Sequence, residues 1–571
     1  MSQSKQRMVI TRHESLRLRD AILPVLIGAS LIAGSVASNA YAQVTRLPGV
    51  IDRPVRDYVP DLTVEPKQRS KEASEPEIQL PADADEIVAK IDTIEFEGND
   101  VLSSDYLGSV AAPYIGRELT KGDIARLKYD ISKAYYDRGY VLVRVVTPPQ
   151  SLDAGNLKVS IIEARIGDVS VDNTALNEGF ASKLAGRLPV GEVFRESVVE
   201  SRVSDITELS DVEASLTLKP GDEIGETDAV VTIREADETT QSVSIDNYGS
   251  ELTGEIVARG DFQINNSLGR GEEIGIGVRA SEEDLKSIYA NLVMPTGFSN
   301  VKLELDALYS ENEIGDVLEA LNSSGESDRY GIALSKALTN TRAVKNTVRA
   351  GYERRKHESF LDDVKETEDN IRQAYLEFTS ARRTGSRLVS YVSLKWLNGL
   401  GGSGADDIGE ADASRATGDP EASIFRLNGY VGYYPAPRQT VSLSIFGQST
   451  SDTLLSSDLF AIGGYGSVRG FPVAQEVGDD GYQASLQYSY LFGPSDGWQT
   501  RVGAFYDVGH VSSEIPGETI DDTLESAGLS VEVASPNRMT KMVFDWASPL
   551  GSYDGANIDD NTYYFRISQD F

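Results

Sequence analysis

Short segments in which polar and apolar residues alternate fill the C-terminal part of this chain, from Gln241 to Phe571. Such alternation is the pattern of a β-strand that has one polar and one apolar face. About sixteen of these segments can be counted, an even number that is typical of outer-membrane β-barrels. The last segment is the clearest, with an apolar face made of Tyr563, Phe565, Ile567 and Phe571. The pattern therefore predicts an all-β transmembrane barrel of about sixteen antiparallel strands over residues 237–571.

The connections between these segments alternate between long and short. The long ones are 311–327, 357–369, 398–421, 450–480 and 549–559, and the short ones lie near 295–299, 340–342, 384–385, 435–437 and 535–537. Long loops outside the cell and tight turns on the periplasmic side are typical of outer-membrane barrels. A soluble β-sandwich also alternates, but it needs a second sheet to cover its apolar face and would not normally end on an aromatic-terminated amphipathic strand. The two features together favour a barrel.

Residues 1–42 have the composition of a secretory signal peptide. A basic lead precedes an apolar stretch, and an A-x-A site that ends at Ala42 predicts cleavage before Gln43. The alternative is a membrane-anchoring helix, but the apolar run is short and is interrupted by Pro24 and by glycines. No later apolar run is long enough to span a bilayer as a helix, so a mature chain in a membrane would have to be a barrel.

Two similar segments lie between the signal peptide and the barrel. Residues 43–86 are rich in proline, and we expect them to form an extended tether. Residues 87–164 and 165–236 then show the same order of strand, helix, helix, strand and strand, and the second helix of the first segment is expected to begin at Thr120. A repeat of about seventy residues predicts two copies of one small α+β domain.

The composition argues against several classes of function. Lys and Arg number 54 against 89 Asp and Glu, so a formal net charge of -35 disfavours nucleic acid as a partner. The absence of cysteine excludes disulfides, thiolate metal sites and cysteine nucleophiles. His13 falls in the signal peptide and His510 on the lipid-facing side of its strand, which leaves only His357, in an acidic loop, as a general base. We therefore expect no catalytic residue and no cofactor.

Acidic pairs in the expected long loops raise the question of a metal site. Asp362-Asp363 and Asp406-Asp407 provide the carboxylate oxygens that calcium prefers. Runs of acidic residues in loops are, however, usually solvated surface, so no metal site is predicted.

A glycine-rich loop from Phe460 to Phe471 ends in Val468-Arg469-Gly470-Phe471. Its glycines allow positive φ and tight folding, so the loop can enter a narrow space and present one guanidinium group. A charge in such a place needs a partner, because an unpaired buried ion is costly. An exposed turn with an incidental arginine is the alternative.

The alternation in the strand near residues 498–511 suggests that partner. Its pattern turns Val502 and Tyr506 toward lipid, and Phe505, Asp507 and Gly509 toward the lumen. Asp507 is then an inward-facing carboxylate, and the glycine beside it leaves room for the loop that carries Arg469 to approach. We expect an ion pair between Arg469 and Asp507 inside the barrel.

These two stretches resemble the motifs of a known family. Val468-Arg469-Gly470-Phe471 resembles the VRG[FY] motif in the sixth extracellular loop of the two-partner secretion (TpsB) outer-membrane transporters, of the haemolysin secretion/activation type. Phe505-Tyr506-Asp507-Val508-Gly509 resembles the F-x-D-x-G strand motif of the same transporters. Two POTRA-like domains extend the resemblance from about Ile87 to the end of the chain, where the aromatic terminal strand and Phe571 resemble a barrel-assembly signal.

The resemblance implies a channel in the outer membrane of a Gram-negative bacterium, with the N-terminal domains in the periplasm. These domains would receive an unfolded TpsA-like exoprotein by adding it as a strand to a sheet edge. The other implied partners are outer-membrane lipid and, during biogenesis, the barrel-assembly machinery. An insertase that folds other barrels is the alternative, although insertases usually carry more than two periplasmic repeats. Transporters of this type often begin with a helix that plugs the pore, and none can be identified in residues 43–86.

Overall fold

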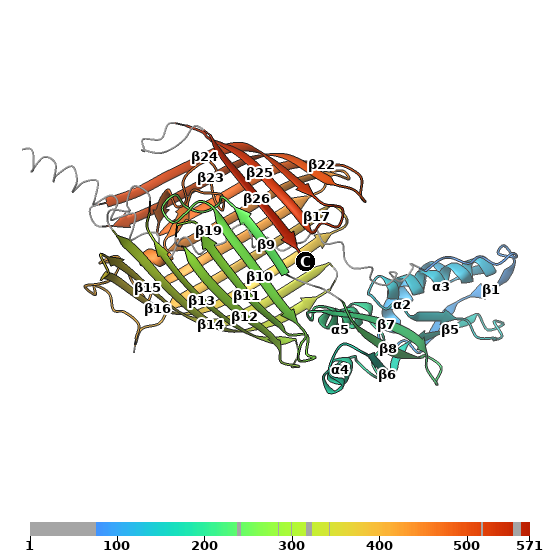
Figure 1. The fold of residues 1–571 in the computed structure, drawn as a ribbon. Helices are drawn as coiled ribbons and strands as arrows, with labels where there is room; N and C mark the ends of the chain where they lie inside the picture. The colour runs from blue at the N-terminus through green and yellow to red at the C-terminus, as the bar shows by residue number, and fades with distance from the viewer. Residues whose placement is uncertain are drawn as a thin grey trace, which may run out of the picture.

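The structure is a computed structural model that describes residues 76–571, except residues 237–240, 284, 299, 316–321, 342, 403, 516–517 and 552–560. The expected signal peptide, its cleavage site between Ala42 and Gln43, and most of the expected tether lie outside the described residues. Two small α+β domains are followed by a β-barrel (Figure 1). In the described part of the chain, no helix has the length and apolar character needed to cross a membrane.

The first domain combines two small sheets with helices on one side. Its elements are β1 (Ile87–Ile91), β2 (Thr93–Glu97), α2 (Ser104–Ala111), η1 (Ala112–Tyr114), β3 (Arg117–Thr120), α3 (Lys121–Tyr136), β4 (Val143–Val146) and β5 (Asn156–Glu163). β5 pairs with β2 in parallel and with β4 antiparallel, while β1 pairs with β3. α3 begins where expected because Thr120 and Asp123 form a capping box. Leu127, Ile131 and Tyr135 on its buried face belong to the core of the domain.

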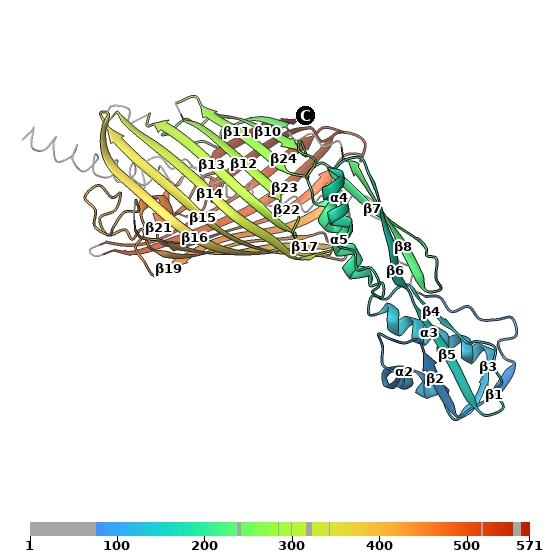
Figure 2. The ribbon, with the colours of Figure 1, turned by 90° about the horizontal axis from the view of Figure 1, so that it is seen from below.

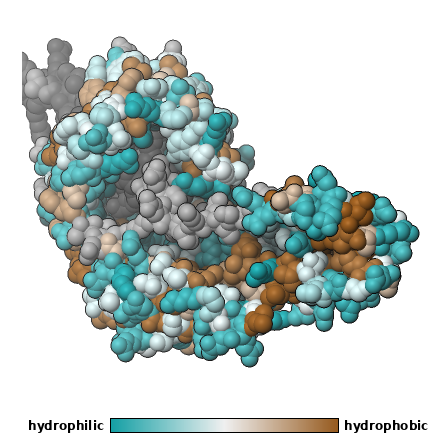
Figure 3. Space-filling model, turned by 90° about the vertical axis from the view of Figure 1, so that its right-hand side faces the viewer, coloured by the Kyte–Doolittle hydropathy of each residue, from teal (hydrophilic) through white to brown (hydrophobic). Residues whose placement is uncertain are grey.

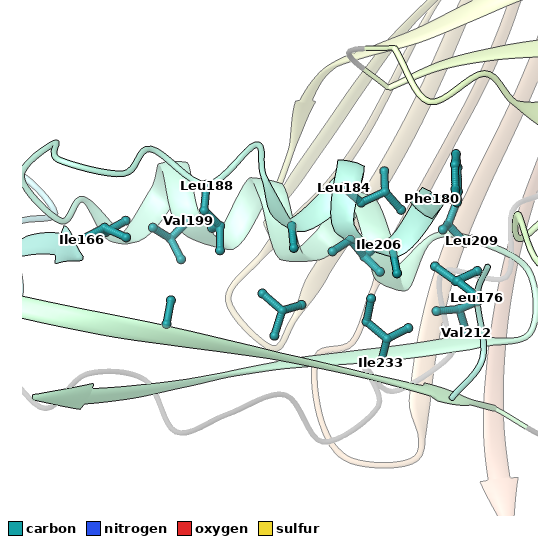
Figure 4. Close-up of a cluster of buried hydrophobic side chains, with 14 of the residues drawn as sticks. Ile166, Leu176, Phe180, Leu184, Leu188, Val199, Ile206, Leu209, Val212 and Ile233 are labelled. Atoms are coloured by element: carbon teal, nitrogen blue, oxygen red, sulfur yellow. The ribbon is translucent and has the colours of Figure 1, made fainter. Parts of the chain in front are cut away.

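The second domain repeats this arrangement. Its elements are β6 (Arg165–Asn173), α4 (Glu178–Ala185), α5 (Glu196–Thr207), β7 (Val212–Pro220) and β8 (Glu226–Glu235). β8 pairs with β6 in parallel and with β7 antiparallel. Phe180 and Leu184 of α4 and Ile206 of α5 pack against Ile233 and its neighbours on the sheet (Figure 4). The prediction of two copies of one small α+β domain is confirmed.

A barrel of sixteen antiparallel strands forms the rest of the chain. The strands are β9 (Gln241–Asp246), β10 (Val257–Asn265), β11 (Glu273–Ser281), β12 (Lys286–Pro295), β13 (Val301–Glu313), β14 (Ser323–Asn340), β15 (Val344–Leu361), β16 (Val364–Thr384), β17 (Leu388–Gly399), β18 (Ser423–Tyr433), β19 (Gln439–Thr450), β22 (Asp480–Phe492), β23 (Gln499–Ile515), β24 (Glu518–Ala534), β25 (Thr540–Pro549) and β26 (Thr562–Asp570). β26 pairs with β9, so the last strand closes the barrel on the first. On β23, Val502 and Tyr506 are exposed whereas Phe505 and Asp507 are buried. The predicted barrel is confirmed.

The expectation of a long loop at 357–369 is wrong. β15 and β16 continue through this stretch and meet in a tight turn at Asp362 and Asp363, whose φ angles are 48° and 61°. Positive φ at both central residues is what a two-residue hairpin turn of this twist requires. Strands that continue beyond the lipid no longer need an apolar face, so they can carry charged residues on both sides. The many charged residues of this stretch therefore gave it the appearance of a loop in the sequence. His357 therefore lies on β15, opposite Asp369 of β16, and not in a loop.

The second domain contacts the end of the barrel that carries the short turns (Figure 2). Asn340, at the end of β14, donates from Nδ2 to Oδ1 of Asp205 on α5 at 3.0 Å. Lys345, near the start of β15, forms an ion pair with Glu208, which follows α5. The turn between β15 and β16 consequently lies at the opposite end of the barrel.

Candidate functional site: the loop inside the barrel

The connection between β19 and β22, residues 451–479, folds into the barrel, and this segment is named the lumen loop. It contains the short helix η3 (Ser456–Asp458) and a small hairpin made of β20 (Phe460–Ile462) and β21 (Glu476–Gly478). Its apolar side chains are buried against the inner wall, in a cluster made of Phe460, Ile462, Val468, Phe471, Val511 and Leu524. The glycine-rich loop singled out in the sequence therefore lies within the lumen.

Two glycines allow the lumen loop to approach the wall. Gly470 has a φ of 94°, and a Cβ atom there would lie 3.2 Å from Pro549. Gly509 faces the loop from β23, and a Cβ atom there would come within 2.8 Å of both Ile462 and Val468. Contacts this short do not occur at real side chains, so Gly509 permits the close packing of the loop against β23.

Two carboxylates hold Arg469 at the tip of the lumen loop. Its Nε donates to Asp507 Oδ2 at 2.7 Å and its Nη2 to Asp507 Oδ1 at 3.0 Å, while its Nη1 donates to Asp545 Oδ2 at 2.8 Å. The guanidinium also lies over the ring of Phe505, with 3.1 Å between Cζ and the ring centre. Arg469 is 2% exposed, and Asp507 and Asp545 are 0% and 1% exposed. A bidentate, buried pair of this kind fixes both the position and the orientation of the loop tip.

The surroundings keep Arg469 charged. Burial alone would lower the pKa of its guanidinium, but the charge and hydrogen bonds of Asp507 and the charge of Asp545 raise that pKa above its usual value. The Ser485 hydroxyl donates a further hydrogen bond to Asp507 Oδ1 at 2.6 Å. The Tyr564 hydroxyl accepts one from the Gly470 amide at 2.9 Å, which ties the loop to β26 as well.

Asp545 was not predicted as a partner of Arg469. The alternation of β25 does place it on the face opposite Met542 and Phe544, so its inward orientation was readable from the sequence. The sequence does not show how close Asp545 lies to Asp507, because β24 separates their two strands. The tilt and stagger of the strands decide which side chains come together inside a barrel.

Two other aspartates hold the base of the lumen loop. Asp458 in η3 accepts hydrogen bonds at 2.8 Å from Arg355 and at 3.0 Å from Arg426, both on the inner wall. Asp479 accepts one from Arg415 at 2.6 Å. Burial would raise the pKa of Asp479, but Arg415 and other donors hold it below its usual value. The loop is thus fastened at its base and its tip by separate ionic contacts.

The C-terminal strand presents one face to each side of the wall. Tyr563, Ile567 and Phe571 are exposed on the outside, whereas Tyr564 is buried beside the lumen loop. The Phe571 amide donates to the carbonyl oxygen of Gln241 at 2.9 Å, next to the seam that closes the barrel.

The acidic pairs considered in the sequence do not form a metal centre in the described residues, where no group of three or more suitable side chains converges. Asp362 and Asp363 form the turn between β15 and β16, and Asp406 accepts a hydrogen bond from the Asn370 amide. His510 faces outward and interacts with Thr523 at 3.0 Å.

Comparisons with known proteins agree with this architecture. The family model described as haemolysin secretion/activation protein ShlB/FhaC/HecB matches residues 225–534, and the model of the ShlB-type POTRA domain matches residues 89–164. The heme/hemopexin transporter protein HuxB of Haemophilus influenzae (strain 86-028NP) is 23% identical over 495 residues, which cover 83% of this chain and 85% of that protein. The outer membrane transporter CdiB of Dickeya dadantii (strain 3937) is 21% identical over 489 residues, covering 82% and 85%.

Two solved structures share the fold. CdiB from Escherichia coli superposes with a TM-score of 0.73 at 20% identity, covering 94% of this chain and 98% of that chain. CdiB from Acinetobacter baumannii gives a TM-score of 0.65 at 16% identity, covering 89% and 95%. Both support two POTRA-type domains followed by one barrel.

Proposed function

The chain belongs to the haemolysin secretion/activation family ShlB/FhaC/HecB, and on that premise we propose that it exports one unfolded protein partner through its barrel. It is an outer-membrane transporter of two-partner secretion, and its POTRA domains lie in the periplasm. The end with short turns therefore faces the periplasm, and the turn between β15 and β16 faces outward. The observation that carries the export mechanism is the lumen loop, which lies across the route and is held at its tip by Arg469.

The POTRA domains offer strand edges to an extended polypeptide. β2 and β4 are the outer strands of the main sheet in the first domain, and β6 and β7 are the outer strands in the second. A polypeptide added to such an edge forms main-chain hydrogen bonds that tolerate many sequences. Apolar side chains gather along these domains beside the end of the barrel (Figure 3), a surface that suits an unfolded chain.

The barrel then supplies the route across the membrane, and the lumen loop closes that route. An exported chain has to share the lumen with this loop, so the contacts of Arg469 determine where the loop lies during transport. Besides the exoprotein, the proposed partners are the surrounding outer-membrane lipid and the barrel-assembly machinery during biogenesis. The relatives named above are transporters, and we assign no enzymatic activity, cofactor or nucleic acid to this chain.

Loss of the whole protein distinguishes export from barrel insertion. In a strain without the gene, we expect one exoprotein to disappear from the medium while the amounts of other outer-membrane barrels stay unchanged. Quantitative proteomics of the medium and of the outer membrane measures both. A broad fall in porins without a specific secretion defect would instead identify an insertase and refute the proposal.

Removal of Phe571 tests the proposed assembly signal. The deletion takes away an exposed aromatic residue and a main-chain hydrogen bond to Gln241. We expect less heat-modifiable, folded protein in outer-membrane fractions, and we expect Phe571→Tyr, which keeps an aromatic ring, to assemble normally. Equal amounts of folded protein with and without Phe571 would show that the signal lies elsewhere.

A further inference from the structure

Two arginines face the membrane from neighbouring strands. Arg354 on β15 and Arg372 on β16 are direct partners in the antiparallel ladder. The residues that follow them, Arg355 and Gln373, point into the lumen, where Arg355 Nη2 donates to Gln373 Oε1 at 2.9 Å. Because side chains alternate along a strand, Arg354 and Arg372 project from the outer surface.

Both arginines lie at the outer edge of the apolar belt. Tyr330 is the ladder partner of Arg354 and lies at the same height on the outer face. Just closer to the periplasm, this face carries the exposed aromatic residues Tyr352, Trp396 and Phe425, and the last two stack with their ring centres 6.2 Å apart. Rows of aromatic side chains mark the membrane interfaces of such barrels. Arg354 is about ten residues beyond the periplasmic start of β15, and about 3.3 Å per residue at a tilt of about 40° gives about 25 Å, the height of the apolar belt. The Arg354 guanidinium therefore reaches the headgroup layer of the outer leaflet. Arg372 lies at the same height, with its Nη2 packed beside Gly404 of the connection between β17 and β18.

The described residues leave this pair of charges uncompensated. Like charges directly opposite each other on a strand pair destabilise a sheet. No carboxylate of the described residues is within ion-pair distance of Arg354 or Arg372. Asp328, on the same face of β14, lies opposite Lys356 in the ladder, and Lys356 forms its ion pair with Glu358 at 2.8 Å. The Nε atom of Arg372 is buried and has no hydrogen-bond partner among the described residues.

We propose that Arg354 and Arg372 bind a phosphate group on a glycolipid of the outer leaflet. A phosphate monoester carries a charge of about -1.5 to -2 at neutral pH, which matches two guanidinium groups. The planar donors of arginine also fit phosphate oxygens in bidentate pairs. The aromatic and aliphatic surface directly beneath accepts the acyl chains of the same lipid, so headgroup and tails meet matching chemistry at the right heights.

Binding of lipid A tests the site in the purified full-length protein. The probe is lipid A, compared with enzymatically dephosphorylated lipid A, and native mass spectrometry counts the lipid retained by protein released from nanodiscs. We expect wild-type protein to retain lipid A and to bind the dephosphorylated form at least about tenfold more weakly, since hydrogen bonds to charged groups dominate the contact. Equal binding of the two lipids by wild-type protein overturns the proposal without any variant.

Variants then locate the site. The double variant Arg354→Gln, Arg372→Gln is expected to bind lipid A as weakly as wild-type protein binds the dephosphorylated form. Heat-modifiable migration checks that the variant is folded. Arg382→Gln is the matched control, because Arg382 is exposed on the outer face of β16 near its periplasmic end. Undiminished retention by the double variant, or an equal loss in Arg382→Gln, contradicts an assignment to Arg354 and Arg372.

Discussion

Replacing Arg469 by alanine is expected to reduce export sharply while the barrel still assembles in the outer membrane. The change leaves Asp507 and Asp545 buried without their cation. Removing one partner of a buried ion pair costs about 3–5 kcal/mol, which lowers the ratio of anchored to released loop by about a hundredfold or more. The barrel is held by its closed ladder of strands, so it does not depend on this contact.

A loop released only at its tip obstructs the channel. Its base stays fastened, because Asp458 keeps Arg355 and Arg426 and Asp479 keeps Arg415. The freed segment then samples many conformations inside the lumen and competes with the exported chain for the same space. This is the physical reason to expect lost export and not a permanently open channel.

A double-mutant cycle measures the coupling. Arg469→Ala, Asp507→Asn and their combination are compared by the amount of exoprotein in the medium per folded transporter. Because both changes break one contact, the combination is expected to export no less than Arg469→Ala alone. Asp545→Asn should reduce export less than Asp507→Asn does. The side chain of Arg469 donates one hydrogen bond to Asp545 but two to Asp507.

Arg501→Ala is the matched control for that cycle. Arg501 lies on the same strand as Asp507, but its pair with Glu532 is long, at 4.0 Å, and more than a third exposed on both sides. Exposed ion pairs contribute little to stability, so Arg501→Ala should leave export unchanged. Additive losses in the combination of Arg469→Ala and Asp507→Asn would show that the two residues act separately.

Strand alternation carried most of what the sequence could predict. It gave the barrel, the strand count and the inward orientation of Asp507, because one buried face per strand leaves a period of two in the sequence. The prediction from alternation was wrong at 357–369, where β15 and β16 extend past the lipid and both faces carry mostly polar residues. Alternation reports contact with lipid, so it cannot distinguish a strand in water from a loop.

The fastening of the lumen loop shows the second limit. Arg469 and Asp507 stood out because glycines and apolar residues isolate them in the sequence. Asp458 and Asp479 belong to no motif that sets them apart in the sequence. Their partners come from β15, β18 and the connection between β17 and β18. Contacts between segments so far apart depend on the closed shape of the barrel, which no local pattern encodes.

The first POTRA domain contacts the second domain. The Glu196 amide donates to the carbonyl oxygen of Gly139 at 2.9 Å, and Arg165 pairs with Asp100 at 2.6 Å. The second domain is joined to the barrel through its own residues, among them Asp205. The first domain can therefore be removed without cutting into the barrel or the contact between Asp205 and Asn340.

Deleting residues 87–163 is consequently expected to leave a folded barrel and normal growth but to stop export almost completely. The deletion removes the strand edges of β2 and β4, so an unfolded exoprotein loses part of its proposed docking surface and is degraded in the periplasm. Heat-modifiable migration measures the barrel, and immunoblots of medium and periplasm follow the exoprotein. As a control, the transporter with Arg501→Ala carries a change in the barrel and should export normally. Normal export by the deletion protein would place substrate capture in the second domain or the barrel, whereas a general loss of outer-membrane barrels would show that the domain serves their assembly.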